Sequence, residues 1–195
     1  MPRWTATLIA STGHSTLASS PPVSKGVAYV PDHTADVRAF DAIGATGCSG
    51  TPKLCVPLWQ QRLNALNWTA SVTVSGGTVY IGSWDGRLYA IDAESGQQKW
   101  AFEAGQDPAN HNQVGFQSSA AVVDGVVYVG CRDAHVYALD AKTGRKRWDY
   151  PTSKSWVNGT PAVQAGIVYV GTSDTSRLMA LDAKSGRLRF NFDAK

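Results

Sequence analysis

The sequence predicts an all-β protein in which one four-stranded unit is repeated four times. The evidence is a recurring Val-Tyr-Val-Gly type of run, constant spacing around each run, and a composition with 19 Gly, seven Trp and seven Tyr in 195 residues. In addition, no window of eleven or more residues has apolar side chains at the helical period. Four-stranded units repeated about every 40 residues are typical of β-propeller blades.

Each unit begins with a short apolar strand, a tight turn and a second strand that contains a Tyr. A Val lies six residues before this Tyr in every copy, in the pairs Val23 and Tyr29, Val74 and Tyr80, Val122 and Tyr128, and Val163 and Tyr169. A Gly lies three residues before each Tyr, at Gly26, Gly77, Gly125 and Gly166. Glycine at this point supplies the positive φ that a two-residue hairpin turn needs.

The third strand follows a second hairpin signal, such as Asp85-Gly86, and ends at an Asp. This Asp lies 12 residues after the Tyr in three copies and 13 in the last, and three copies have an aromatic residue eight positions later. We therefore expect blades at 20–59, 71–100, 119–148 and 160–190, with 1–19 as the outer strand of a preceding blade, around Trp4, and a connection. A β-sandwich is the competing architecture, but it has no reason to repeat its sequence strand for strand.

The end of each unit resembles the tryptophan-docking motif of propellers of the pyrroloquinoline-quinone (PQQ) type. This superfamily includes quinoprotein alcohol dehydrogenases and BamB-like scaffold proteins of the bacterial outer membrane. The matching residues are Ala90, Asp92, Gly96 and Trp100; Ala138, Asp140, Gly144 and Trp148; and Ala180, Asp182, Gly186 and Phe190. The first copy reaches Trp59 only after ten extra residues. Small Ala and Gly residues let the aromatic ring lie between blades, so these residues are expected to be structural.

The resemblance also implies a size for the ring. Propellers of this superfamily usually close with eight blades, so four blades are expected to form an open half of such a ring. The open ends of an arc expose apolar faces, and we expect self-association or poor solubility of the isolated chain.

The resemblance does not carry quinone chemistry with it. The dehydrogenases have adjacent cysteines over the cofactor, a catalytic Asp and calcium ligands, whereas this sequence has no adjacent cysteines and most of its Asp residues recur in every repeat. A non-catalytic binding or scaffold module without cofactor or metal is therefore the favoured interpretation. The alternative is a fragment of a PQQ-dependent dehydrogenase, with PQQ and calcium held by residues outside this chain.

Two cysteines bracket the insertion in the first unit. Cys48 and Cys55 are seven residues apart, and the Gly and Pro between them allow the chain to fold back to disulfide distance. Similar insertions occur in secreted bacterial propellers of this type, which favours a disulfide over free thiols or a metal site. Cys131 replaces a small residue of the repeat and is expected to fill a small buried space.

Aromatic residues at the entrances to three blades are candidates for ligand contact. Trp68, Phe116 and Trp156 each precede the first strand of a blade by three or four residues, near the mouth of the propeller channel. The alternative is that they wedge between blades. The long polar connection 105–113 contains His111, a further candidate for recognition or metal binding, with a solvated loop as the alternative.

Charge and hydropathy exclude several classes of partner. The net charge is +3 without a long basic run, so we expect no nucleic-acid partner, and no apolar stretch is long enough for a membrane helix. The partner is expected to be a protein or a small ligand. The first residues lack the apolar core of a signal peptide, so the chain reads as a fragment of a larger exported bacterial protein, located in the periplasm, on the cell surface or outside the cell.

Overall fold

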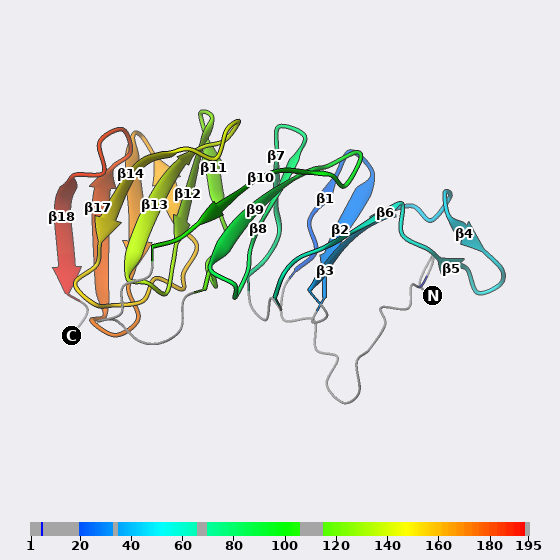
Figure 1. Ribbon diagram of the computed structural model, residues 1–195, viewed down its shortest axis with the longest axis horizontal. Helices are drawn as coiled ribbons and strands as arrows, with labels where there is room; N and C mark the ends of the chain where they lie inside the picture. The colour runs from blue at the N-terminus through cyan, green and yellow to red at the C-terminus, as the bar shows by residue number, and fades with distance from the viewer. Residues whose placement is uncertain (1–4, 6–19, 33–34, 66–69, 106–114, 194–195) are drawn as a thin grey trace.

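The computed structural model describes residues 5, 20–32, 35–65, 70–105 and 115–193, and every regular element in these residues is a β-strand. Four antiparallel sheets of four strands each confirm the predicted all-β fold of four blades (Figure 1).

The blades follow one another along the chain, and the strands of each blade are paired in sequence order. The first blade contains β1 (Val23–Ser24), β2 (Val27–Pro31), β3 (Asp36–Asp41) and β6 (Trp59–Arg62). The second contains β7 (Thr73–Ser75), β8 (Thr78–Gly82), β9 (Arg87–Asp92) and β10 (Gln98–Glu103). The third contains β11 (Ala121–Val123), β12 (Val126–Gly130), β13 (His135–Asp140) and β14 (Lys146–Pro151). The fourth contains β15 (Ala162–Gln164), β16 (Ile167–Gly171), β17 (Arg177–Asp182) and β18 (Leu188–Asp193).

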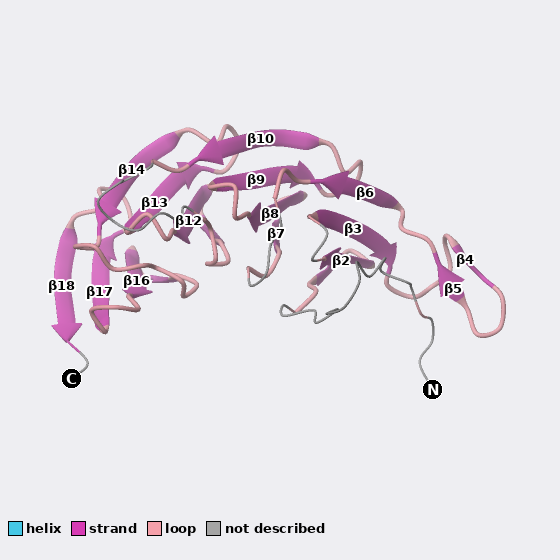
Figure 2. Cartoon of the chain, turned by 60° about the horizontal axis from the view of Figure 1, so that its bottom comes forward, coloured by secondary structure: helices cyan, strands magenta, loops and turns pink. Residues whose placement is uncertain are grey.

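The four sheets are arranged as an open arc. Figure 2 shows β6, β10, β14 and β18 along the convex side, and the first and last blades at opposite ends. On the inner side, the short strand β11 contacts both β7 and β15. The chain is therefore a partial propeller, as its sequence predicts.

The tight turn of each blade has the geometry that its glycine predicts. In the third blade, Val123 pairs with Val126 across a turn in which Asp124 has φ 49° and Gly125 has φ 72°. Positive φ at both central residues is the geometry of a type I′ turn, whose twist matches that of the two strands. The turn therefore sets the register of β11 on β12.

The core lies between blades. Tyr80, Leu88 and Trp100 of the second blade pack with Val127 and Leu139 of the third in one buried cluster. Two equivalent clusters join the first blade to the second and the third to the fourth. Because each cluster takes side chains from two sheets, no blade buries its apolar residues alone.

The closing tryptophan of each blade lies against a turn of the next. Trp100 donates a hydrogen bond from Nε1 to the carbonyl oxygen of Ala141 at 3.1 Å. Its ring lies so close to Gly144 that a Cβ there would be 2.7 Å from ring carbons. Trp59 and Trp148 make the same contacts with Ala93 and Gly96, and with Ala183 and Gly186. The repeated glycine is therefore required by the indole as well as by its own positive φ.

The last blade presents an uncovered apolar face. Leu178, Phe190 and Phe192 are 43%, 51% and 63% exposed, whereas Val136 and Trp148, at repeat positions equivalent to Leu178 and Phe190, are 0% and 9% exposed. We call Leu178, Phe190 and Phe192 the open face. The same residue pattern is thus core in one blade and surface in the next, because a neighbouring sheet covers only the former.

The insertion in the first blade folds as a hairpin that the sequence did not predict. It contains β4 (Cys48–Ser49) and β5 (Leu54–Cys55), and Cys48 and Cys55 form the predicted disulfide with a Cα–Cα distance of 4.0 Å. The backbone N–H of Thr5 donates to the carbonyl oxygen of Lys53 at 3.0 Å. The expected outer strand around Trp4 lies outside the described residues.

The blade boundaries differ slightly from those expected. First strands begin two or three residues later, and the last strands continue three residues beyond the closing aromatic residue, to 62, 103, 151 and 193. In the last three blades the aromatic residue lies inside the strand, because that strand pairs with the third strand on both sides of a register shift, as at Trp100.

Candidate functional site

The site is built where the turns between second and third strands meet the connections that lead into the next blade, at the lower edge of the arc in Figure 1. The backbone N–H of Arg132, in such a turn, donates to the carbonyl oxygen of Gly115 at 3.0 Å. The N–H of Ser173, in the next such turn, donates to the carbonyl oxygen of Trp156 at 3.0 Å. Each bond joins a turn to the connection that leads into the same blade.

A buried arginine lies at the centre of this region. The guanidinium carbon of Arg132 is 3.8 Å from the ring centroid of Trp156 and 4.8 Å from that of Trp84. Arg132 is only 5% exposed, and both tryptophans are half-buried. Contacts of this kind attract a cation to the faces of aromatic rings. We call Trp84, Arg132 and Trp156 the Arg132 cluster.

Two side-chain donors of the cluster lack an acceptor in the described part of the protein. These are the Nε of Arg132 and the Nε1 of Trp84, and both atoms are buried. The other buried arginine of the described residues, Arg38, pairs with the carboxylates of Asp32 and Asp36. Arg132 is therefore a buried cation with a donor, its Nε–H, that is left for another group.

The electrostatic setting of Arg132 agrees with this geometry. Burial lowers the pKa of its guanidinium, and the negative charge of Asp174 acts in the opposite direction. One carboxylate oxygen of Asp174 accepts hydrogen bonds from the backbone N–H of Trp156 at 3.0 Å and from the hydroxyl of Ser173 at 3.2 Å. Asp174 thus favours the charged state of Arg132 from a distance, without accepting a hydrogen bond from it.

The sequence predicts a ligand contact for only one member of the cluster. Trp156 was a candidate for ligand contact, whereas Trp84 and Arg132 were not singled out. A signal was present, because both residues stand directly before the repeated Asp, where the fourth blade has Ser173. A position that varies inside an otherwise constant turn is free of the structural role that the repeat imposes, and can therefore serve recognition.

The other predicted site residues lie elsewhere. Phe116 is fully buried between blades, with ring centroids 6.5 Å from Phe102 and 6.2 Å from Tyr137, so it takes the blade-wedging position that was the alternative to ligand contact. Trp68 and His111 are outside the described residues. The structure therefore brings only Trp156 of these candidates into the cluster.

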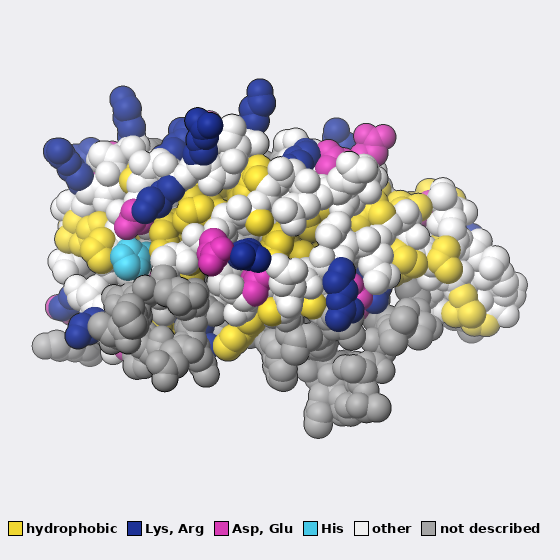
Figure 3. Space-filling model, viewed as in Figure 1, with side chains coloured by type: hydrophobic (Ala, Val, Ile, Leu, Met, Phe, Trp, Pro, Cys, Tyr) yellow, Lys and Arg dark blue, Asp and Glu magenta, His cyan; other side chains and the backbone are white. Residues whose placement is uncertain are grey.

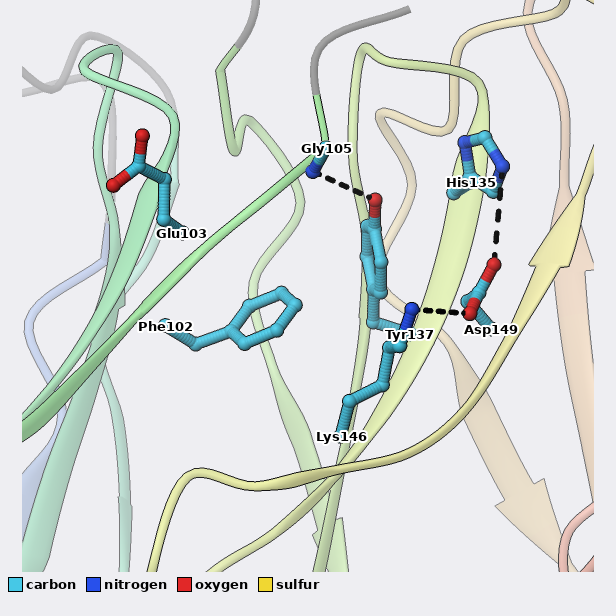
Figure 4. A pocket seen from close by; sticks show the side chains of 7 residues that line it. All are labelled: Phe102, Glu103, Gly105, His135, Tyr137, Lys146 and Asp149. Carbon is cyan, nitrogen blue, oxygen red and sulfur yellow. Dashed lines mark hydrogen bonds and ion pairs between the residues drawn. The ribbon is translucent and has the colours of Figure 1, made fainter.

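A second polar site lies between the second and third blades (Figure 4). It is a pocket of about 340 Å³ lined by Phe102, Glu103, Gly105, His135, Tyr137, Lys146 and Asp149. Asp149 lies 3.9 Å from His135 Nε2 and 2.7 Å from Lys146 Nζ. A hydrogen bond with Asp133 raises the pKa of His135, and burial opposes it. These charged groups already neutralise one another, so the pocket lacks the unsatisfied group found in the Arg132 cluster.

The described residues contain no cluster of metal ligands, and their free thiol is buried. Among the described residues, no three His, Cys, Asp or Glu side chains are grouped closely enough to hold a metal ion. Cys131 is fully buried, as expected, and burial raises the pKa of its thiol. No helix in the described part of the chain could cross a membrane.

Charge on the surface is concentrated away from the cluster. Figure 3 shows Lys and Arg side chains gathered along the upper edge of the molecule. The turns between third and fourth strands contain exposed basic residues, including Lys142, Arg145, Lys184 and Arg187. Since the strands of each blade alternate in direction, these turns lie at the edge opposite to the Arg132 cluster.

Comparison with known proteins identifies relatives of two kinds. Residues 2–156 and 109–195 match the family of PQQ-type repeats described as outer membrane protein assembly factor BamB. A quinoprotein ethanol dehydrogenase of Pseudomonas aeruginosa is 28% identical over 74 residues, which are 38% of this chain and 10% of that protein.

Solved structures show the same fold. BamB from Moraxella catarrhalis superposes with a TM-score of 0.70 at 20% identity, over 90% of this chain and 49% of that one. The quinohemoprotein alcohol dehydrogenase ADHIIG of Pseudomonas putida superposes with a TM-score of 0.77 at 19% identity, over 93% of this chain and 34% of that one. This chain thus spans half or less of the length of these relatives.

The family match covers nearly the whole chain, including all four blades of the structure. The chain belongs to the PQQ-type repeat family described as outer membrane protein assembly factor BamB.

Proposed function

We propose that this chain is a non-catalytic binding or scaffold module of a larger exported bacterial protein. The observation that carries the proposal is the buried guanidinium of Arg132, whose Nε has no acceptor, beside the indoles of Trp84 and Trp156. A buried cation without an acceptor costs free energy in the isolated protein, and a bound partner that supplies an acceptor recovers it. Such an arrangement supports recognition, since it offers hydrogen-bond donors and aromatic surface but no nucleophile.

The family supports a protein partner. Its description names a factor in outer membrane protein assembly, and assembly depends on contacts between proteins. The Cys48–Cys55 disulfide fits an extracytoplasmic, oxidising compartment. The proposed location is therefore the periplasm, the cell surface or the extracellular space.

A second candidate function is favoured by the sequence match to a quinoprotein ethanol dehydrogenase. Under this alternative the chain is part of a PQQ-dependent enzyme. Its residues do not fit the quinone site that the resemblance implies, because Cys48 and Cys55 are bonded to each other and the buried Cys131 has no adjacent cysteine. The quinone and calcium would have to be held by residues outside this chain.

Binding of PQQ separates the two functions. PQQ and calcium are added to the purified protein, free quinone is removed by gel filtration, and the absorbance of the protein fraction is recorded. We expect no retained quinone, while the apo form of a quinohemoprotein alcohol dehydrogenase, as the positive control, retains it. One quinone retained per chain would overturn the proposed function.

A further inference from the structure

We infer that the Arg132 cluster binds a carboxylate group, which accepts hydrogen bonds from the edge of the Arg132 guanidinium. This inference rests on the proposed binding function and names the chemistry of the ligand. The ligand chemistry follows from three features of the cluster: a charge without an ion pair among the described residues, the planar donor group of Arg132 beside two indoles, and the position of Asp174.

The charge of Arg132, which has no ion pair among the described residues, favours an anionic ligand. Arg132 is more than nine-tenths buried, and the only other buried arginine in the described residues is neutralised by two carboxylates. Arginine does not lose its proton in proteins, so Arg132 cannot escape the cost of burial by becoming neutral. An anionic ligand lowers this cost directly.

The indoles determine how the anion can approach. The guanidinium carbon of Arg132 lies over the rings of both Trp84 and Trp156, so both indoles occupy space beside the cation. The N–H bonds lie in the guanidinium plane, and the buried Nε has no acceptor for its own N–H. A carboxylate is planar and accepts two parallel hydrogen bonds from the edge of a guanidinium in the same plane. It therefore matches the planar donor group that Arg132 offers.

Asp174 favours an anion with a single charge. Its carboxylate is close enough to act on the charge of Arg132, although its own oxygens are engaged by Trp156 and Ser173. A doubly charged, tetrahedral phosphate would be repelled more strongly by Asp174 than a carboxylate would. The cluster thus selects for shape and for charge.

Thermal unfolding of the whole chain in sodium acetate tests the inference. The midpoint temperature is compared with that in sodium chloride of equal ionic strength, for the wild type, Arg132→Met and the matched control Arg145→Met, which removes an exposed arginine. At about five times its dissociation constant, acetate should raise the midpoint of the wild type and of the control by about 2–4 °C. Arg132→Met should show no acetate-specific shift.

Two results of this experiment would overturn the inference that Arg132 binds a carboxylate. No shift in the wild type, or an equal shift in Arg132→Met, would overturn it. If Arg132→Met does not fold, Arg132→Lys replaces it, because lysine keeps the charge and lacks the planar pair of donors. The acetate shift of Arg132→Lys should be smaller than that of the wild type, and an equal shift would also overturn the inference.

Two further arms identify the source of the carboxylate. The blocked tripeptide Gly-Glu-Gly is compared with Gly-Gln-Gly in the same assay. A shift with the Glu peptide shows that a polypeptide side chain reaches Arg132, whereas a shift with acetate alone assigns the site to a small carboxylate. Failure of the acetate experiment leaves the PQQ experiment unaffected, so the two proposals fail separately.

Discussion

Truncation of a closing tryptophan tests the idea that aromatic side chains join the blades. Trp100→Ala removes an indole that is only 8% exposed, packs against the Gly144 turn and donates a hydrogen bond to Ala141. A buried Trp removes about 200 Å² of surface from water, which corresponds to about 5 kcal/mol as an upper bound. Because part of the cavity relaxes and Cβ remains, we expect a loss of about 3–5 kcal/mol in the free energy of unfolding.

The open end of the arc provides a matched control. Phe190 occupies the same repeat position in the last blade but is 51% exposed. Phe190→Ala should therefore cost only about 1 kcal/mol, since about half of its surface is already in water. The assay is urea denaturation followed by circular dichroism at low protein concentration. Equal losses for the two variants, or a loss below about 1 kcal/mol for Trp100→Ala, would refute the inter-blade role.

Three further predictions follow from the fold. Alkylation and mass measurement of oxidised protein without reductant should modify Cys131 alone, and only after denaturation; modification of Cys48 and Cys55 as well would contradict the disulfide. The hydrogen bond from Arg147 lowers the pKa of Asp140 from 3.8 to about 2, so this carboxylate stabilises the fold above about pH 4 and loses the effect as the pH falls toward 2. Asp140→Asn should accordingly be less stable than the wild type at pH 7 and equally stable near pH 2, and a pH-independent difference would speak against it. The open face should cause the isolated chain to self-associate, so light scattering should report a mass that rises with concentration, whereas a monomer at all concentrations would exclude this.

The pocket around His135 shows how a polar site can be structural. His135 lies between Asp133 and Asp149, and Tyr137 donates a hydrogen bond to Asp133 at 2.5 Å while accepting one from the Gly105 backbone at 3.2 Å. Each polar group therefore has a partner within the two blades. Arg132 differs in this respect, which is why the binding proposal rests on it.

The repeat pattern was sufficient to predict the blades, because its determinants are local. A turn glycine such as Gly125 specifies a type I′ hairpin, alternating apolar residues specify the buried faces, and the spacing from Tyr128 to Asp140 specifies strand length. Since the same local determinants occur in all four repeats, each repeat predicts the same four-stranded sheet. The disulfide was predictable for the same reason, because Cys48 and Cys55 are close in sequence.

The Arg132 cluster depended on tertiary structure. Trp84 and Arg132 come from equivalent turns 48 residues apart, and Trp156 comes from a connection in the following blade interface. Their proximity results from the stacking of sheets, which no local spacing encodes. The same stacking decides that Trp100 is core and Phe190 is surface, although both occupy one position of the repeat. Burial depends on whether a neighbouring sheet is present, and that is a property of the assembled arc rather than of the sequence motif.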